Sequence, residues 1–329
     1  MEICKLILHI MDTTQNIFVP SDIELENINE EVYPLVESKL KKVFNSQDRK
    51  QAHFINSNIE KMIFNYKTNE INFVELSQQI AGYIFDEKRR YNIFHTSDFI
   101  LAEVKVNEIR YIVGLDNANS PKLTHTTKEV DNQIINEIIS YKTLFSNNIM
   151  KFDRIFIVEY SNSSLQLIEN PYYFNTNKIY VFQEILQCSS KPSFKETVAV
   201  LSDSVEMLSE KYNMDHTQNL STLKTLLMES VQEQKISTEE IAEEIFQDKI
   251  IAKRDFKDDL FKHGIDETIL LENVRPRKSD KTQKIKTDNG IEITIPIDFM
   301  TNKEHVEFVT ENDGTISIKL KNIQSIISK

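Results

Sequence analysis

The segment that most constrains the fold of this chain is Phe99–Leu115, which reads FILAEVKVNEIRYIVGL. Its first half places Ile100, Ala102, Val104 and Val106 on one strand face and Leu101, Glu103 and Lys105 on the other. Its second half, Ile109–Leu115, is almost continuously apolar and β-branched. This pattern predicts a hairpin that turns at Asn107-Glu108 and whose second strand is buried on both faces.

Length and composition describe an ordinary globular protein. A chain of 329 residues exceeds one simple core, so we expect two or three domains. With five glycines and no Gly-rich phosphate loop, the sequence predicts no nucleotide cofactor. No apolar run approaches the roughly 20 residues of a membrane helix, and the N-terminus is a poor signal peptide. Cys4 and Cys188 form neither a disulfide framework nor a zinc motif, so we expect a reduced, cytoplasmic protein with no membrane contact.

The first part of the chain has an α+β pattern. Helical spacing of apolar residues predicts three helices before the hairpin, over about residues 30–45, 56–66 and 72–90. After the hairpin, RIFIVEY and the segment beyond it predict two strands, over residues 154–160 and 165–169. We interpret residues 132–145 as a further strand because of their β-branched content. Residues 1–190 therefore predict an α+β domain, a mainly antiparallel sheet with inserted helices.

The pattern changes after residue 190. Capping boxes of the form S-x-x-E at Ser193 and Ser237 predict helix starts, and Gly264 predicts a helix end. Residues 193–264 therefore predict an all-helical domain. Further on, Asn289-Gly290 and Asn312-Asp313-Gly314 each stand between short apolar runs, as in β-hairpins. We expect residues 275–329 to form a basic arm followed by a small C-terminal β subdomain.

Charge is unevenly distributed along the chain. The net charge of −12 disfavours nucleic acid, because phosphate contacts require cations. Residues 275–286 nevertheless carry six cations against Asp280 alone, a net charge of +5; the cations are Arg275, Arg277, Lys278, Lys281, Lys284 and Lys286. Such an extended segment can follow a phosphate backbone without reading bases. The alternative is a linker whose charge balances the acidic helices before it.

Two smaller basic clusters stand at the ends of predicted helices. They consist of Lys39, Lys41 and Lys42, and of Lys88, Arg89 and Arg90. Cations at the C-terminal end of a helix also interact favourably with its dipole, so these clusters have a structural explanation as well. We include both clusters with the basic arm in the predicted DNA-binding set.

Asp98, Glu103 and Lys105 suggest an alternative chemistry. A metal-dependent nuclease needs two carboxylates to hold a divalent ion and a lysine that helps to activate water. Glu103 and Lys105 lie on one strand face, as that site requires, but charged residues that alternate along a strand more often form its solvated face. Asp98 is only five residues upstream, close for an acid that normally comes from a separate element. The histidines are scattered without ligand spacing, so we predict no other metal site.

The order of segments resembles the bacterial nucleoid-associated protein family called NdpA or YejK. The resemblance lies in ILHIMDTTQNIFVPSDIEL, in DFILAEVKVNEIRYIVGLDNANS, in KFDRIFIVEYSNSSLQLIENPYYF and in the closing KIKTDNGIEITIPIDFM. It covers essentially the whole chain and rests on strand spacing, not on a catalytic signature. It implies an acidic, cytoplasmic protein of the nucleoid that binds double-stranded DNA without a known reaction. It supplies no set of DNA-contacting residues.

Three functions follow for comparison. The first is a non-catalytic, nucleoid-associated protein that binds double-stranded DNA largely without regard to sequence and serves chromosome organisation. The second is a metal-dependent nuclease that uses Asp98, Glu103 and Lys105. The third is a protein-interaction module in defence against foreign DNA, in which the acidic helices of residues 193–264 dock a partner or a second copy of the chain. A homo-oligomer is compatible with each of the three.

Overall fold

The chain divides into two compact units, residues 1–193 and residues 194–329. The first unit ends close to residue 190, where the sequence predicts the end of the α+β domain. The predicted separation of residues 193–264 from residues 275–329 stays a prediction. The computed structural model describes residues 1–25, 30–143, 153–174, 177–271, 274, 282–296, 299, 304–310 and 315–325.

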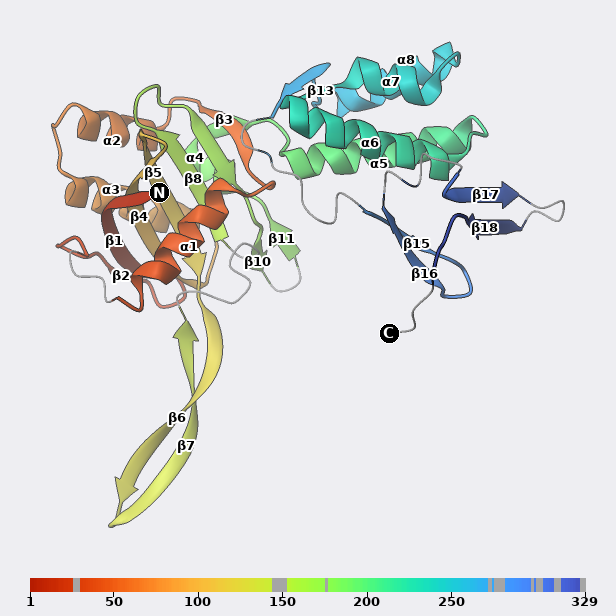
Figure 1. Ribbon diagram of the computed structural model, residues 1–329. Helices are drawn as coiled ribbons and strands as arrows, with labels where there is room; N and C mark the ends of the chain where they lie inside the picture. Colours follow the sequence, from red (N-terminus) through yellow and green to blue (C-terminus); the bar gives the residue numbers. More distant parts are fainter. Residues whose placement is uncertain are drawn as a thin grey trace. The chain divides into compact units, whose positions relative to one another are not determined.

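The first unit is built on an antiparallel sheet of eight strands in the order β12-β3-β9-β8-β5-β4-β1-β2 (Figure 1). This architecture confirms the predicted α+β class. The strands of the sheet are β1 (Glu2–Asp12), β2 (Ile17–Val19), β3 (Lys50–Phe54), β4 (Thr96–Val106), β5 (Ile109–Ala118), β8 (Asp153–Glu159), β9 (Leu165–Ile168) and β12 (Cys188–Ser190). The helices are α1 (Tyr33–Phe44), α2 (Asn58–Lys67), α3 (Phe73–Arg90) and α4 (Phe182–Leu186), and a small separate ribbon joins β10 (Tyr172–Phe174) to β11 (Asn177–Ile179).

The predicted central hairpin is β4–β5. Asn107 and Glu108 both have positive φ, 48° and 68°, the left-handed conformation that tight two-residue hairpin turns require. Val106 pairs with Ile109, and the register continues without a shift to the pair of Ser97 and Ala118. The expectation that the second strand is buried on both faces is confirmed, and β4 is buried on both faces as well.

Helices cover both faces of this sheet (Figure 1). On one face, residues of α2, α3 and α4 pack with Ile7, Phe99 and Leu101. On the other face, Val36, Leu40 and Val43 of α1 pack with the side chains of alternate strand residues such as Ile100 and Ala102. Because successive strand residues point to opposite faces, a strand between two helical layers needs apolar residues at nearly every position.

The three helices expected before the hairpin are confirmed as α1, α2 and α3. Helix α3 begins with a capping box, in which the Asn72 side chain accepts from the backbone N–H of Glu75 and the Glu75 side chain accepts from that of Asn72. Helix α1 begins after Val32 with a proline in its first turn. The sequence analysis missed β3, whose few residues lack a long apolar run.

A second hairpin follows β5 directly and consists of β6 (Ser120–Val130) and β7 (Gln133–Thr143). We call this hairpin the β arm, since Figure 1 shows it projecting from the sheet of the first unit. Its turn is again two residues with positive φ, Asp131 and Asn132. Strand character of residues 132–145 is confirmed as far as Thr143, but the sequence analysis had not identified β6 or the hairpin.

The second unit is mainly helical in its first part, as predicted. Its helices α5 (Phe194–Lys211), α6 (His216–Glu233), α7 (Thr238–Phe246) and α8 (Ile250–Lys262) share one apolar core. Short strands β13 (Lys235–Ser237) and β14 (Thr268–Leu270) pair with each other, which the sequence analysis did not predict. The Ser237 side chain accepts from the backbone N–H of Glu240, so this predicted helix start is confirmed.

Two antiparallel pairs follow among the described residues of this unit, as predicted. The first joins β15 (Thr282–Lys286) to β16 (Glu292–Pro296), and Gly290 in its turn has φ of +88°. A glycine suits this position because other residues rarely adopt such a backbone conformation. The second joins β17 (Val306–Thr310) to β18 (Ile316–Leu320), and its expected turn at Asn312-Asp313-Gly314 lies outside the described residues.

Candidate functional site

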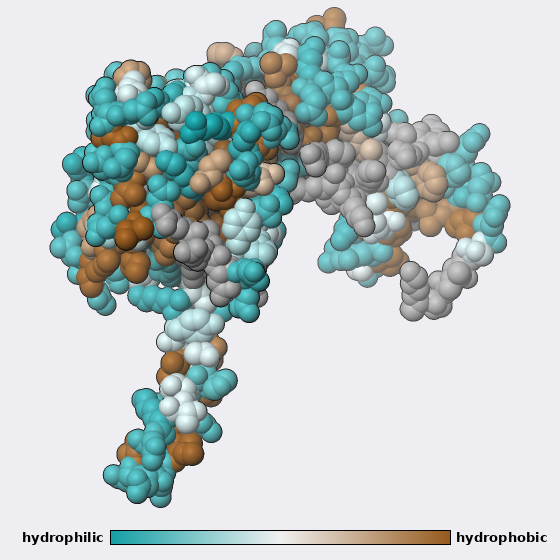
Figure 2. All heavy atoms as spheres, turned by 60° about the vertical axis from the view of Figure 1, so that its left-hand side comes forward, coloured by the Kyte–Doolittle hydropathy of each residue, from teal (hydrophilic) through white to brown (hydrophobic). Residues whose placement is uncertain are grey.

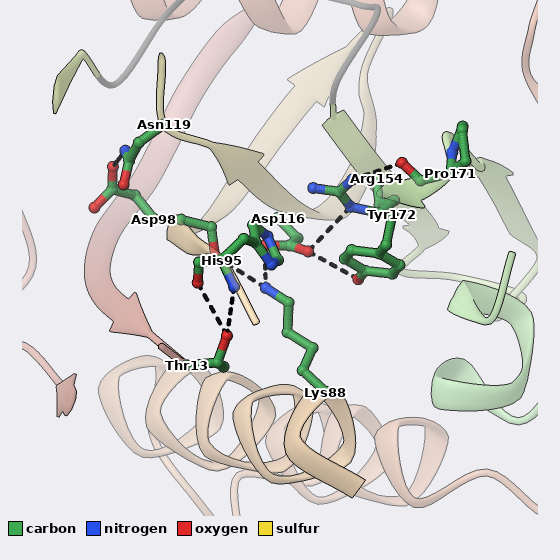
Figure 3. Close-up of polar contacts among 10 residues, drawn as sticks. Thr13, Lys88, His95, Asp98, Asp116, Asn119, Arg154, Pro171 and Tyr172 are labelled. Carbon is green, nitrogen blue, oxygen red and sulfur yellow. Dashed lines mark hydrogen bonds and ion pairs between the residues drawn. The ribbon is translucent and has the colours of Figure 1, made fainter. Parts of the chain in front are cut away.

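Charged side chains collect in the interior of the first unit, at the end of the sheet where the β arm begins (Figure 3). Three of them, together with a neutral tyrosine, form what we call the Asp116 cluster: Lys88, Asp116, Arg154 and Tyr172. Strand pairing brings two of the four residues together, because Asp116 of β5 and Arg154 of β8 are directly opposite one another in the register. Lys88 comes from the last turns of α3 and Tyr172 from β10, so the cluster ties four elements together.

The Asp116 carboxylate is fully buried and accepts from three side chains. The Lys88 ammonium lies 2.6 Å from Oδ1, and it also donates to Ser97 Oγ at 2.9 Å. Arg154 Nε donates to Oδ2 at 3.1 Å, and the Tyr172 hydroxyl donates to the same oxygen at 2.9 Å. Lys88 is itself 0% exposed and Arg154 2% exposed. The carboxylate is thus the shared acceptor of two buried cations.

Electrostatics keep this cluster ionised at neutral pH. Burial by itself raises the pKa of Asp116, but the charges of Lys88 and Arg154 outweigh burial and hold that pKa well below its usual range. Burial lowers the pKa of Lys88 to about 8, against the attraction of Asp116. Burial, together with the adjacent carboxylate, raises the pKa of Tyr172 well above its ordinary value. The cluster therefore acts as a buried ionic cross-link at the base of the β arm.

A cavity of about 170 Å³ adjoins the cluster. His95, Asn119, Arg154 and Tyr172 are among the residues that line it. Among the described residues, Arg154 Nη2 and both ring nitrogens of His95 have no hydrogen-bond partner although they are buried. Burial, followed by the positive charge of Lys88, lowers the pKa of His95 well below its ordinary value, so the ring is neutral. The cavity wall thus presents hydrogen-bonding groups beside an aromatic face.

The three residues of the nuclease hypothesis are not brought together. Asp98 and Glu103 stand five residues apart on β4, so they point to opposite faces and are roughly 16 Å apart along the strand. Asp98 accepts from Asn119, whereas Glu103 accepts from the Tyr66 hydroxyl at 2.6 Å and forms an ion pair with Arg110. The Lys105 ammonium lies 2.6 Å from Glu108. In the part of the chain that the structure describes, no three His, Cys, Asp or Glu side chains form a metal-ligand group.

Two of the cations predicted to bind DNA are buried, which corrects that part of the prediction. Lys88 belongs to the Asp116 cluster, and Lys39 is 1% exposed, with its ammonium donating to Asn117 Oδ1 at 2.9 Å. Both helices lie on the sheet, and these lysines meet polar groups at the end of β5. The sequence held a signal for this: Lys39 follows Val36 by three residues and Lys88 follows Ile84 by four, so each continues a buried helix face.

The other predicted cations of these two clusters are exposed. Lys41 lies 2.7 Å from Glu37, and Arg90 lies 2.7 Å from Glu87. Lys42 and Arg89 are also exposed, as are Lys284 and Lys286 in β15. The remaining members of the basic arm, Arg275, Arg277, Lys278 and Lys281, lie outside the described residues. The sequence analysis did not single out Asp116, Arg154 and Tyr172, because their meeting depends on strand register.

Comparison with known proteins identifies the family. The family model described as nucleoid-associated protein YejK matches residues 7–327, nearly the whole chain, and agrees with the resemblance seen in the sequence. No curated protein matches the sequence. Among the described residues, no helix is long and apolar enough to span a membrane. The match over both units shows that the chain belongs to the nucleoid-associated YejK family.

Proposed function

We propose that this chain binds double-stranded DNA in the nucleoid of a bacterial cytoplasm, largely without regard to sequence and without catalysing a reaction. Membership of a nucleoid-associated family supports the DNA partner. The local concentration of cations in residues 275–286 supports a backbone contact that reads charge, not bases. The net charge of −12 limits the affinity. Contacts between these cations and phosphates make the affinity sensitive to salt, because they release counterions.

The observation that carries the proposal is the arrangement of Lys284 and Lys286 on β15. They are two residues apart in a strand, so both point to the same face of the β15–β16 pair, and both are exposed. Ile285 points to the other face, where it is paired with Ile293. The β15–β16 pair thus has isoleucines on one face and two exposed lysines on the other, and these lysines belong to the basic segment of residues 275–286.

The acid that pairs with Lys286 is weakly engaged. Glu292 stands opposite Lys286 with its carboxylate 3.5 Å from the ammonium, and both side chains are largely exposed. An exposed ion pair contributes only about 0–1 kcal/mol, so a phosphate can replace this carboxylate at little cost. Lys41, Lys42, Arg89 and Arg90 offer further exposed cations in the first unit, and we assign them a secondary role.

A salt titration of duplex binding tests the proposal. We expect the affinity of the purified chain for a short fluorescent duplex to fall steeply between about 50 and 200 mM salt. Lys284→Gln with Lys286→Gln should weaken binding to every duplex sequence similarly and reduce the salt slope by about 2. The matched control is Lys319→Gln with Lys321→Gln, which removes two exposed lysines from the other C-terminal ribbon. The assignment of the DNA contact to β15 is contradicted if the salt slope falls equally in the β15 variant and in the control. It is also contradicted if the slope of the β15 variant does not fall.

Incubation of supercoiled plasmid with the chain and Mg²⁺ or Mn²⁺ tests the absence of catalysis. We expect no nicking, because Asp98, Glu103 and Lys105 have separate partners and Asp98 points to the opposite face of β4 from the other two. Metal-dependent nicking that disappears in Glu103→Ala or Lys105→Ala would establish the nuclease instead.

A further inference from the structure

Buried polar atoms without a partner collect at one place in the first unit, the cavity of about 170 Å³ beside the Asp116 cluster. Six buried side-chain atoms among the described residues have no hydrogen-bond partner, and Arg154 Nη2 and the two ring nitrogens of His95 are three of them. Buried polar groups in folded proteins are nearly always hydrogen-bonded. These two side chains of the cavity wall therefore point to a ligand that pairs with them.

Both side chains are held in place by contacts that leave these atoms unused. The Thr13 hydroxyl donates to the His95 carbonyl at 3.0 Å and accepts from the His95 backbone N–H at 2.9 Å (Figure 3). Arg154 Nε donates to Asp116, and Arg154 Cζ lies 4.1 Å from the centre of the Tyr172 ring. The centre of the His95 ring lies 5.4 Å from the centre of the same ring. Groups that are fixed in advance lose little conformational entropy when they bind a ligand.

Charge selects the kind of ligand. Among the described residues, Lys88 and Arg154 form ion pairs with one shared carboxylate, that of Asp116, so one buried positive charge is in excess. The charge of Asp98 also acts on Lys88, but the Asp98 carboxylate accepts from Asn119 and burial raises its pKa. None of the described residues that line the cavity is acidic. Because a buried charge is costly without compensation, an anion suits this cavity better than water does.

Size and lining narrow the class of anion. The cavity has more than ten times the roughly 10–15 Å³ that a single water needs. Arg154 Nη1 donates to the Pro171 carbonyl only at 3.4 Å, so the edge of the guanidinium formed by Nη1 and Nη2 can meet both oxygens of a carboxylate. Burial keeps the His95 ring neutral by lowering its pKa, and a neutral ring still has one N–H to donate. Ile93, Ala118 and Pro171 supply apolar surface for a short hydrocarbon chain.

We propose that this cavity binds a small organic monocarboxylate, whose carboxylate accepts from Arg154 Nη2 and from the His95 ring and whose hydrocarbon part lies on the apolar wall. A single negative charge balances the single positive charge in excess. Thr96 and Asn119 of the wall are half-buried, so the ligand can enter from their side. The exposed cations assigned to DNA do not line the cavity, so this site is independent of DNA binding.

Isothermal titration calorimetry of the purified full chain with sodium butyrate, without DNA, tests the proposal. We expect one saturable site with a dissociation constant of about 1 mM or below. Butyramide has a similar shape without the charge, and it should bind at least about tenfold more weakly because charge-assisted hydrogen bonds are stronger. Butyrate should also raise the midpoint of thermal unfolding above that in sodium chloride of equal ionic strength, since it binds the folded state.

Two variants locate the site. His95→Phe keeps an aromatic ring but removes both nitrogens, and it should weaken butyrate binding about tenfold. Ala118→Leu fills the cavity and should abolish binding. The matched control is His9→Phe, because His9 also has a buried ring nitrogen without a partner but does not line the cavity. Its affinity for butyrate should equal that of the original chain, and circular dichroism checks that each variant is folded.

Absence of saturable butyrate binding overturns the proposal, as does an affinity that neither cavity variant changes. Equal binding of butyrate and butyramide contradicts the requirement for an anion. If inorganic phosphate binds more tightly than butyrate and loses affinity in His95→Phe, the cavity is a phosphate site and the carboxylate assignment is wrong. None of these measurements contains DNA, so their expected results do not change if the DNA proposal fails.

Discussion

The two hairpins that follow each other along the chain, β4–β5 and β6–β7, share one construction and have opposite surroundings. Both have strands of 10 or 11 residues, an unbroken antiparallel register and a two-residue turn with positive φ at each position. β4–β5 is buried between helical layers, whereas β6–β7 is exposed along nearly its whole length. Turn chemistry and pairing therefore define a hairpin without deciding whether it belongs to a core.

The contrast shows where each hairpin obtains its stability. β4–β5 gains from apolar burial on two faces, at roughly 25 cal/mol per Å² of apolar surface. Among the described residues of the first unit, no such layer covers the arm, which is attached at its base (Figure 2). There the Thr143 hydroxyl donates to the Ser120 carbonyl at 2.9 Å, and Lys142 lies 3.5 Å from Asp12. The Asp116 cluster fixes the end of β5 just before the arm begins.

Removal of the Asp116 charge should have the largest effect. Asp116→Asn keeps the shape but leaves Lys88 and Arg154 buried without a carboxylate, so we expect a loss of about 3–5 kcal/mol in the free energy of unfolding. Urea unfolding followed by circular dichroism, at one protein concentration for all variants, measures it.

The double variant Asp116→Asn with Lys88→Met serves as the control for this experiment. It removes one of the two buried cations that have lost their carboxylate partner, so it should recover part of the free energy of unfolding. A loss below about 1 kcal/mol in Asp116→Asn, which is the range of an exposed ion pair, would mean that the cluster is hydrated. The ion pairs at the base of the arm would then be as weak as exposed ones, and the base would not differ from the arm in this respect.

Gly114→Ala should have the next largest effect. A Cβ atom at Gly114 would lie 2.2 Å from the ring of Phe156, its fully buried partner on β8. The ring must move within a packed core, so we expect a loss of about 1–3 kcal/mol.

Ser140→Thr is the matched change on the arm, since it also adds one methyl group to a strand. Ser140 is exposed, and we expect a change within about 0.5 kcal/mol. Thermal unfolding measures both variants, and Phe156→Leu should relieve part of the cost of Gly114→Ala. Equal losses at the two positions would contradict the difference in packing between the hairpins.

Sequence patterns were informative about the fold where local chemistry decides it. The turn at Asn107-Glu108, the periodicity of α3 and the glycine at residue 290 each act through neighbouring residues. The β arm was only half recognised, because β6 is mostly polar and its turn, Asp131-Asn132, lacks glycine. The apolar run of β5 indicated that the first hairpin is buried, whereas the β-branched residues of β7 did not show that the second hairpin lies outside the helical layers.

The candidate site was harder to predict. Asp116 and Arg154 are far apart in the sequence and meet through the pairing of β5 with β8. Lys39 and Lys88 were assigned to the surface because lysines at helix ends are usually solvated. Their positions on the buried helix faces carried the opposite information, and the acceptors that make burial possible, Asn117 and Asp116, come from a strand.

The ion pair between Lys128 and Glu137 on the arm should have the smallest effect. It is the exposed counterpart of the Asp116 cluster, with side chains 56% and 40% exposed and an ammonium–carboxylate distance of 2.6 Å. A double-mutant cycle of Lys128→Gln and Glu137→Gln should give a coupling of about 0.2–1 kcal/mol. Salt should weaken this coupling, because exposed charges are screened. A coupling above about 2 kcal/mol would mean that this ion pair is shielded from water, and the contrast with the buried Asp116 cluster would fail.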